Sequence, residues 1–217
     1  MSADLKVECQ GEELILCKER AIYWTAQTTL VISDLHIGKS AFFRRNGVPV
    51  PGTVGQTDLQ RLGLLIEGYK PEKLVITGDM FHHNMNSDVE VFKEWRGRFT
   101  ELTVQLIKGN HDRLKNSELE NLGIEVYQHA MLSGPFRFIH DKPKITDGYY
   151  NISGHIHPGI LINGRAKQTL KFPCFYFSDT CAVLPAFSTF TGLYILEPKK
   201  GDRFYAITPE KVVRLPS

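Results

Sequence analysis

The amino-acid sequence predicts an α/β fold in which two mixed sheets pack face to face and helices cover their outer sides, a four-layer α/β/β/α sandwich. Two patterns lead to this prediction. In the first half of the chain, short β-branched segments alternate with helical patterns. The second half contains short strand-like segments separated by Gly and Pro, without a long helical period. With 217 residues and a hydrophobic content of 42%, we expect a single domain over residues 1–217.

The first half of the chain contains six expected strands. Three open the sequence, at Leu5–Glu8, Glu13–Cys17 and Ala21–Trp24. Three more are short and rich in β-branched residues, as buried strands are, at Thr28–Ile32, Lys73–Thr77 and Leu102–Ile107.

Helical patterns separate the buried strands. The first runs from about Thr53 to Gly68, where leucines recur on one face, and Pro71 closes it. The second runs from Ser87 to about Phe99, with Ser87 as the expected N-cap and Glu90 completing a capping box. A short helix is expected near Ser117–Leu122. The apolar stripes of these helices are interpreted as core.

From Gly123 onward the sequence predicts strands. The short β-branched or aromatic segments are Phe136–His140, Tyr149–Gly154, Phe175–Phe177, Leu193–Leu196 and Phe204–Ile207. Both termini fall in strand-like segments, so we expect them to share one outer sheet.

Composition restricts the location and the partners of the protein. The start of the chain lacks the apolar region of a secretory signal, and no stretch is apolar enough to span a membrane, so we expect a cytoplasmic protein without membrane contact. The four cysteines have no metal-site spacing and are expected to be free thiols. A net charge of +2 and a pI near 8.3 do not decide whether nucleic acid is a partner.

Polar islands follow the buried strands and supply ligands for metal ions. They are Asp34-Leu35-His36, Gly78-Asp79 and Gly109-Asn110-His111-Asp112, joined later by His140 and Gly154-His155-Ile156-His157. In open α/β sheets, ligands collect beyond the carboxyl ends of strands, near a change in strand order, so these islands predict one shared site. Gly78, Gly109 and Gly154 are expected where the backbone turns tightly or a ligand approaches closely.

The spacing of these residues suits a pair of divalent ions. Such ions lie about 3.5–4 Å apart and clamp the attacking and departing oxygens of a displacement at phosphorus. A carboxylate that touches both ions would fix their separation, and Asp79 is the natural candidate. Imidazole, carboxylate and the amide oxygen of Asn110 form a mixed set that suits Mn, Fe, Zn or Ni better than a site with oxygen ligands only.

The order D-x-H, G-D, G-N-H-D, single His and G-H-x-H resembles that of the calcineurin-like metallophosphoesterase superfamily over nearly the whole chain. Within it, the runs Asp34–Lys39, Gly78–His82 and Ser153–Pro158 look like those of the bacterial phosphoesterase associated with a DNA ligase and a helicase. The resemblance implies the same four-layer sandwich. It also implies a metal-dependent phosphoesterase rather than a degraded site, because His111 and Asp112 are present.

The resemblance implies a role for each residue of the islands. Asp34, His36 and His157 would bind one ion, Asn110, His140 and His155 the other, and Asp79 would bridge them. His111 would reach the phosphate or the leaving oxygen as a general acid, oriented by Asp112. The nucleophile would be a hydroxide shared by the ions, which are implied to be Mn, with Fe, Zn, Ni or Mg as alternatives.

Two features near the islands have more than one interpretation. Lys39, Arg44 and Arg45 alternate with two phenylalanines, which describes either a loop that grips phosphates and stacks bases or solvated charges beside core rings. Many relatives carry an acid three residues after the bridging Asp, where this chain has His82. We therefore assign no ligand role to His82, which either lines the cleft or is a polar residue in a loop, and we favour the loop.

The sequence thus predicts a phosphodiesterase or nuclease that acts on DNA in repair, the repair setting being implied by the resemblance alone. The alternatives are an enzyme for small or cyclic nucleotides and a metal-containing scaffold for a ligase or helicase partner. The oligomeric state stays open, with a homodimer among the choices.

Overall fold

A computed structural model describes residues 3–39, 47, 54–82, 86–142, 148–163 and 168–216, with only the backbone described for 54–56 and 86–88. Its first sheet has seven strands in the order β1 (Leu5–Cys9), β2 (Glu12–Cys17), β3 (Ala21–Trp24), β4 (Thr29–Ile32), β5 (Lys73–Ile76), β6 (Thr103–Ile107) and β7 (Ile124–Tyr127). Strands β1 to β4 pair antiparallel, and β4 to β7 pair parallel. All six strands expected in this half are present, with bounds shifted by at most one residue.

The second sheet has nine strands, of which seven form one path and two branch from it. The path is β14 (Tyr194–Ile195), β11 (Pro158–Asn163), β12 (Thr169–Phe177), β13 (Cys181–Val183), β10 (Tyr150–Ser153), β9 (Phe136–Ile139) and β8 (Ala130–Ser133). Strand β15 (Arg203–Ile207) pairs with β12 and with β16 (Val212–Arg214). Strands β9, β10 and β13 are parallel neighbours, so this sheet is mixed as well. The predicted α/β class with two mixed sheets is confirmed.

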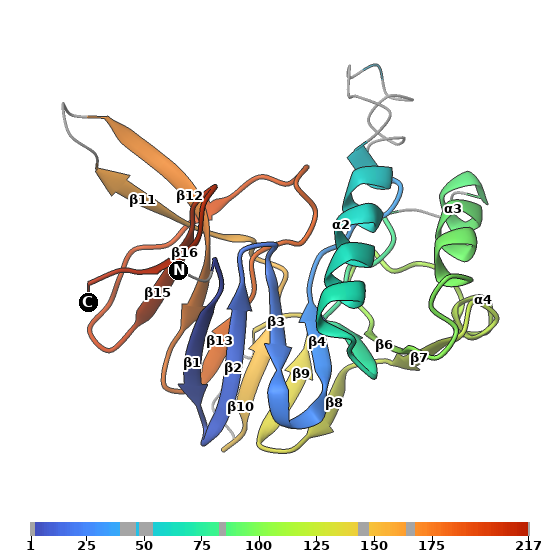
Figure 1. The fold of residues 1–217 in the computed structure, drawn as a ribbon, viewed down its shortest axis with the longest axis horizontal. Helices are drawn as coiled ribbons and strands as arrows, with labels where there is room; N and C mark the ends of the chain where they lie inside the picture. The colour runs from blue at the N-terminus through green and yellow to red at the C-terminus, as the bar shows by residue number, and fades with distance from the viewer. Residues whose placement is uncertain are drawn as a thin grey trace.

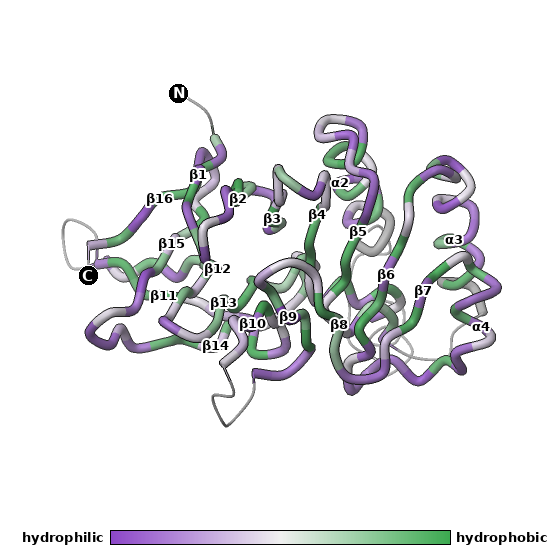
Figure 2. The backbone as a smooth tube through the Cα atoms, turned by 90° about the horizontal axis from the view of Figure 1, so that it is seen from below, coloured by the Kyte–Doolittle hydropathy of each residue, from purple (hydrophilic) through white to green (hydrophobic). Residues whose placement is uncertain are grey.

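The period of two along a strand divides the side chains of the first sheet between two cores. Val31 of β4 and Val75 of β5 point into the core between the sheets, which also holds Phe136 and Phe175 of the second sheet. Their neighbours in sequence point to the opposite face, where Leu30, Ile32, Leu74 and Ile76 contact the helices. Figure 2 shows the two sheets as adjacent layers with the helices beside the first.

Three α-helices cover the outer face of the first sheet: α2 (Val54–Tyr69), α3 (Asn86–Arg96) and α4 (Asn116–Glu120). Leu62 of α2 and Phe92 of α3 are fully buried against the sheet, and Figure 1 shows α2 in front of β4. Because α3 begins at Asn86, Ser87 lies inside the helix and is not its N-cap.

The outer face of the second sheet differs from the expected layer. Between residues 130 and 216 the described residues form only strands and loops, so no helix of the described chain covers this face. A small apolar cluster takes its place, made by Ile160, Cys174, Phe204 and Ala206. The short strands of this half pack their outer side chains against each other. Their sequences alone do not distinguish this arrangement from cover by a helix.

The termini also differ from the expectation, because they belong to different sheets. Strand β1 forms an edge of the first sheet and β16 lies in the second. The amide of Val212 donates to the carbonyl of Ala3 at 2.9 Å, which joins the two sheets at this end. Cys9, Cys17, Cys174 and Cys181 are free and buried, as predicted. Among the described helices, none is long and apolar enough to cross a membrane.

Candidate metal centre

The predicted ligands meet at the carboxyl ends of strands from both sheets. Asp34 and His36 follow β4, Asp79 follows β5 and Asn110 follows β6, whereas His140 follows β9, and His155 and His157 follow β10. Two groups of side chains have ligand atoms within 4.8 Å of one another: Asp34, His36 and His157, and Asp79, His140 and His155. Strand order runs in sequence from β4 to β7, so no change of order marks the site. The site forms instead where the two sheets meet.

The first group has buried ligand atoms that no described residue satisfies. Oδ1 of Asp34, both ring nitrogens of His36 and Nε2 of His157 are buried without a hydrogen-bond partner. Nε2 of His157 lies 3.2 Å from Oδ1 of Asp34, but without hydrogen-bond geometry. Burial, followed by the charge of Lys39, lowers the pKa of His36, which keeps the imidazole neutral. Buried polar atoms without partners are costly, and a divalent cation would satisfy Oδ1 of Asp34, Nε2 of His157 and one ring nitrogen of His36, so this group fits a metal.

In the second group, two side chains lie close to the same ring nitrogen, Nε2 of His140. Nε2 of His140 lies 3.0 Å from Oδ1 of Asn110 and 3.1 Å from Nδ1 of His155. Nδ1 of His140 lies 2.9 Å from the carbonyl of Thr77, and donation to that carbonyl fixes the tautomer and leaves Nε2 free for a ligand. Asn110 thereby joins the three residues of this group, as expected from the sequence.

Asp79 belongs to the second group, and its backbone carbonyl accepts the amide of His36, a residue of the first group, at 2.9 Å. Its Oδ1 lies 3.5 Å from Nε2 of His140, and it accepts the amide of His111 at 2.9 Å. Burial alone would raise the pKa of Asp79 and lower the pKa of His140, but the opposite charges of the pair reverse both shifts. Without a cation the proton of His140 neutralises this carboxylate. A bound metal would displace that proton, which couples metal binding to pH.

The backbone is strained where the ligands lie. Nine non-glycine residues of the described chain have positive φ, and five of them are Asp34, His36, Asp79, His155 and His157. Such conformations cost about 1–3 kcal/mol each and persist where the surroundings enforce them. Alternation between extended and left-handed residues allows two ligands spaced by one residue to turn toward the same point.

Hydrogen bonds between the ligand loops enforce this conformation. The amides of Asp34 and His36 donate to the carbonyls of Gly78 and Asp79 at 3.0 and 2.9 Å, so the two loops prolong the β4–β5 pairing beyond the sheet. The hydroxyl of Ser33 donates to Oδ2 of Asp34 at 2.5 Å, and the amide of His155 donates to the same oxygen at 3.0 Å. Asp34 therefore ties the first sheet to the second.

The three predicted glycines allow the loops to approach. A Cβ at Gly78 would lie 2.0 Å from Nδ1 of His140, and one at Gly109 would lie 2.2 Å from Oδ1 of Asp79. A Cβ at Gly154 would lie 1.5 Å from Oγ of Ser33. Because it lacks a Cβ, each glycine leaves room for a ligand side chain or for a residue that holds one in place, as the sequence indicated.

Asp112 has a different role from the expected one. Its two carboxylate oxygens accept the amides of Phe81 and Gly109, both at 2.9 Å. No hydrogen bond joins Asp112 to the His111 ring in the described chain. The buried Asp112 therefore does not orient His111 but joins the loop after β5 to the loop after β6, and so holds Asp79 beside Asn110.

His82 belongs to the site, contrary to its interpretation as a loop residue. It is 9% exposed, its ring stacks on His111 with centroids 5.0 Å apart, and it meets His36 edge-on at 5.7 Å. The signal in the sequence for a place in the site was the position of His82 three residues after Asp79. The side chain of His111 is 39% exposed and its Nε2 lies 4.0 Å from Oδ2 of Asp79, so this ring stands at the mouth of the centre.

Of the three cations proposed to hold substrate, the described residues include only Lys39. It is half-buried, its amide donates to the carbonyl of His36, and its charge acts on that imidazole. Arg44 and Arg45 lie outside the described residues.

A charged network behind Asp34 went unrecognised in the sequence. The amides of Phe187 and Ser188, in the loop after β13, donate to the carbonyls of Ser33 and Asp34 at 2.8 and 3.1 Å. Arg61 of α2 donates to the carbonyl of Phe187 at 3.2 Å and pairs with the buried Asp58 at 2.6 Å. This loop therefore clamps the strained Asp34 from the side opposite the ligands.

Comparison with known proteins places this geometry among phosphoesterases. Residues 28–191 match the calcineurin-like phosphoesterase family. The chain is similar to a nuclease, MPE, from Pseudomonas putida, with 32% identity, a TM-score of 0.84, and coverage of 98% of this chain and 100% of that chain. It is also similar to the phosphoesterase Yfce from E. coli, with 13% identity, a TM-score of 0.45 and coverage of 86% and 97%. The comparison with curated proteins gives no match.

Proposed function

Because this chain belongs to the calcineurin-like phosphoesterase family and is a metal-dependent phosphoesterase, we propose that it hydrolyses phosphodiester bonds of DNA at a centre for two divalent cations. The observation that supports this most strongly is the group of buried, unpartnered ligand atoms on Asp34, His36 and His157, together with a second group made by Asp79, His140 and His155. The similar nuclease from Pseudomonas putida favours nucleic acid as the substrate.

In this proposal each side of the site holds one cation. Asp34, His36 and His157 would hold the first, Asn110, His140 and His155 would hold the second, and Asp79 would contribute to both. Bound there, divalent cations would supply the Lewis acidity that activates water and stabilises charge on a phosphate. The mixed nitrogen and oxygen donors favour Mn, with Fe, Zn, Ni or Mg as alternatives.

In this proposal His111 is the residue of the chain that acts on the leaving group. This ring stands at the mouth of the centre, and the backbone of His111 is fixed by donation to Asp79. The face of the ring lies against His82, which limits its rotation. These contacts support the proposal that His111 gives a proton to the departing oxygen and that His82 acts on it as a positioning residue.

The test is an activity panel with Mn-loaded protein. We expect turnover of bis(p-nitrophenyl) phosphate and cleavage of single-stranded or nicked DNA, with both activities lost on exhaustive chelation and restored by Mn. Activity on cyclic nucleotides with none on DNA would assign a small-nucleotide enzyme instead. A metal-replete protein that is inert on all phosphoesters yet binds a ligase or helicase would be a scaffold.

Replacement of His111 by asparagine should separate substrates by their leaving groups. General acid catalysis contributes about 10²–10⁴-fold, and it matters little when the leaving group is as weakly basic as p-nitrophenolate. We expect a loss of ~100-fold or more on DNA and of less than ~10-fold on bis(p-nitrophenyl) phosphate, measured as kcat at saturating Mn. Equal losses on both substrates would show that His111 does not protonate the leaving oxygen.

The cellular setting forms a further part of the proposal. Resemblance to the ligase-associated bacterial phosphoesterases supports a single-domain cytoplasmic enzyme of DNA repair that works with a ligase or helicase. Co-purification of those partners with the intact chain would test it.

A further inference from the structure

A cavity of about 340 Å³ lies behind the clamp that holds Asp34. Its polar and aromatic lining includes Lys18, Arg20, Arg61, Phe172, Thr189 and Thr208. These residues come from the β2–β3 turn, helix α2, strand β12, the loop after β13 and the end of β15. We call it the Arg20 cavity.

Arg20 brings a positive charge into this cavity that no carboxylate neutralises directly. Its Nη1 donates to the carbonyls of Ala186 and Ser188 at 3.2 and 2.9 Å. Its Nε and Nη2 make no hydrogen bond with any described residue, and Arg20 forms no ion pair within the described chain. Burial, and then the charge of Arg61, lowers the pKa of Arg20, so the surroundings disfavour its cation. An anion would relieve both effects.

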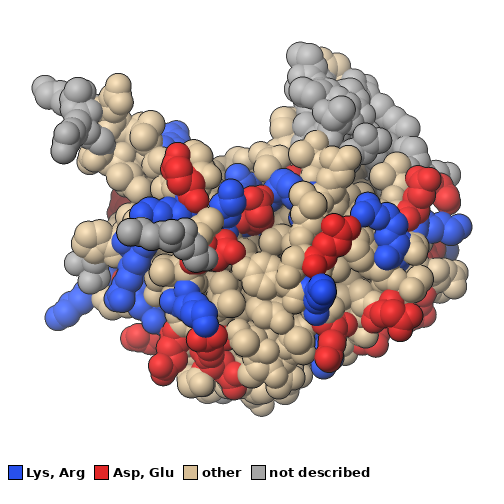
Figure 3. All heavy atoms as spheres, in the orientation of Figure 1, with Lys and Arg blue, Asp and Glu red and all other residues tan. Residues whose placement is uncertain are grey.

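The two carboxylates at this cavity are engaged by other cations. Asp58 pairs with Nη1 of Arg61 at 2.6 Å and Glu19 pairs with Nε of Arg61 at 2.9 Å. Nζ of Lys18 is 3.8 Å from Glu19, and its side chain is 39% exposed. Three cations thus face two carboxylates, and Arg20 and Lys18 keep donors for a ligand. Figure 3 shows basic side chains, interrupted by acidic ones, along the upper part of the face between the β11–β12 hairpin and α2.

The Arg20 cavity and the metal centre share a wall. The carbonyl of Ser188 accepts from Arg20 on the cavity side, and the amide of Ser188 donates to the carbonyl of Asp34 at 3.1 Å on the other side. Ser188 is therefore the one residue that separates the guanidinium of Arg20 from the backbone of Asp34, a proposed metal ligand.

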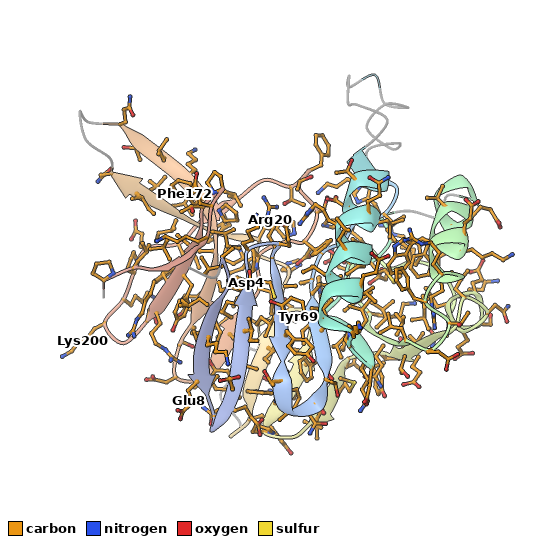
Figure 4. The ribbon with its side chains drawn as sticks, viewed as in Figure 1. Asp4, Glu8, Arg20, Tyr69, Phe172 and Lys200 are labelled. Atoms are coloured by element: carbon orange, nitrogen blue, oxygen red, sulfur yellow. The ribbon has the colours of Figure 1, made fainter. Side chains whose placement is uncertain are left out.

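The remaining wall of the cavity is apolar and aromatic. Phe172 and Pro173 of β12 line it, and the side chain of Phe172 is half-buried. Figure 4 labels Arg20 at the β2–β3 turn and Phe172 within β12, both in the upper part of the view, and the two residues line the same cavity. Proteins bind single-stranded nucleic acid by combining cations, which contact the phosphate backbone, with aromatic rings, on which the bases stack.

From these contacts we propose that the Arg20 cavity holds one nucleotide of the DNA strand that is cut at the metal centre, with its phosphate at Arg20 and Lys18 and its base against Phe172. The proposal rests on the proposed nuclease function, because it names the part of the substrate that lies outside the centre. A diester as small as bis(p-nitrophenyl) phosphate cannot occupy both places.

The test uses Lys18→Gln in the full chain, because the only side-chain contact of Lys18 in the described chain is the weak pair with Glu19. Arg20 is less suitable, since it also holds the clamp loop. We expect Lys18→Gln to lower kcat/KM on a single-stranded oligonucleotide about fivefold and to reduce the salt dependence of log kcat/KM by about 1, the change for one lost phosphate contact. Hydrolysis of bis(p-nitrophenyl) phosphate should not change.

The matched control is Lys6→Gln, which removes the same charge from a side chain that is 68% exposed and paired with Glu13. It should leave both activities and the salt slope unchanged. Equal effects of Lys18→Gln and Lys6→Gln on DNA, or no effect of either, would overturn the assignment while the nuclease function stands. Wild-type protein that cleaves the small diester but no DNA would remove the nuclease function and this proposal with it. Binding of free dTMP that depends on Lys18, with no effect on DNA cleavage, would assign the cavity to a mononucleotide instead.

Discussion

Replacing Asp79 by alanine is expected to reduce hydrolysis of bis(p-nitrophenyl) phosphate at least ~10³-fold and to leave the protein folded. The size of the loss follows from the proposed role of this carboxylate as a ligand to both cations, because its removal would take a ligand from each at once. In the structure Asp79 lies with His140 and His155, 3.5 Å from Nε2 of His140. Bound metal, measured by elemental analysis after gel filtration, should fall below that of the wild-type protein.

Stability should change little in comparison. Asp79 accepts one described backbone hydrogen bond, from His111, and a typical hydrogen bond contributes about 1 kcal/mol. Thermal unfolding by circular dichroism should therefore show a cooperative transition. Asp179→Ala, which removes an exposed carboxylate from the turn between β12 and β13, is the control and should retain full activity. An Asp79→Ala protein with near wild-type turnover, or turnover that survives exhaustive metal removal, would refute the two-cation centre.

Introducing a methyl group at Gly109 is expected to lower activity ~100-fold or more without removing any ionisable group. A Cβ at this position would lie 2.2 Å from Oδ1 and 2.4 Å from the backbone nitrogen of Asp79. The nitrogen cannot rotate away, so the loop after β6 must move relative to the loop after β5. A displacement of about 1 Å in a catalytic constellation costs on the order of 10²-fold in rate. The measurement is kcat on the nitrophenyl diester over a range of Mn concentrations.

Gly68→Ala supplies the matched control for Gly109→Ala. Gly68 lies in helix α2, and a Cβ there would meet nothing within 4 Å. Alanine in a helix is favoured over glycine by about 0.5–1 kcal/mol, so this variant should unfold at a slightly higher temperature with unchanged activity. If Gly109→Ala were as active as Gly68→Ala, the close approach of the two ligand loops would not matter for the chemistry.

The strands and the ligands could be predicted because both leave local patterns. Each of the strands β4, β5 and β6 is a short run rich in β-branched residues, and each is followed within three residues by a ligand candidate, which stands beside a glycine after β5 and β6. The position of Asp34, Asp79 and Asn110 at strand ends follows from these runs alone. Parallel pairing of β4, β5 and β6 then brings the three ends together.

Other features depend on contacts between distant segments. His82 follows β5 in the sequence as an unremarkable loop residue, and only the fold stacks it on His111. Asp112 stands next to His111 in the chain, yet its oxygens face the amides of Phe81 and Gly109. In both cases the partner is set by how two loops approach, which neighbouring residue types do not encode.

The sequence by itself determined the α/β class, the strands of the first sheet and the identity of the metal-ligand candidates, because strand periodicity and ligand spacing are local properties. Only the tertiary structure decided that both sheets supply ligands, that the second sheet is covered by its own strands rather than by described helices, and that Arg20 faces a cavity behind Asp34. The joint site and the cavity arise from packing between residues more than 100 positions apart, such as Arg20 with Ser188, and pairs at that separation leave no periodic trace in a single sequence.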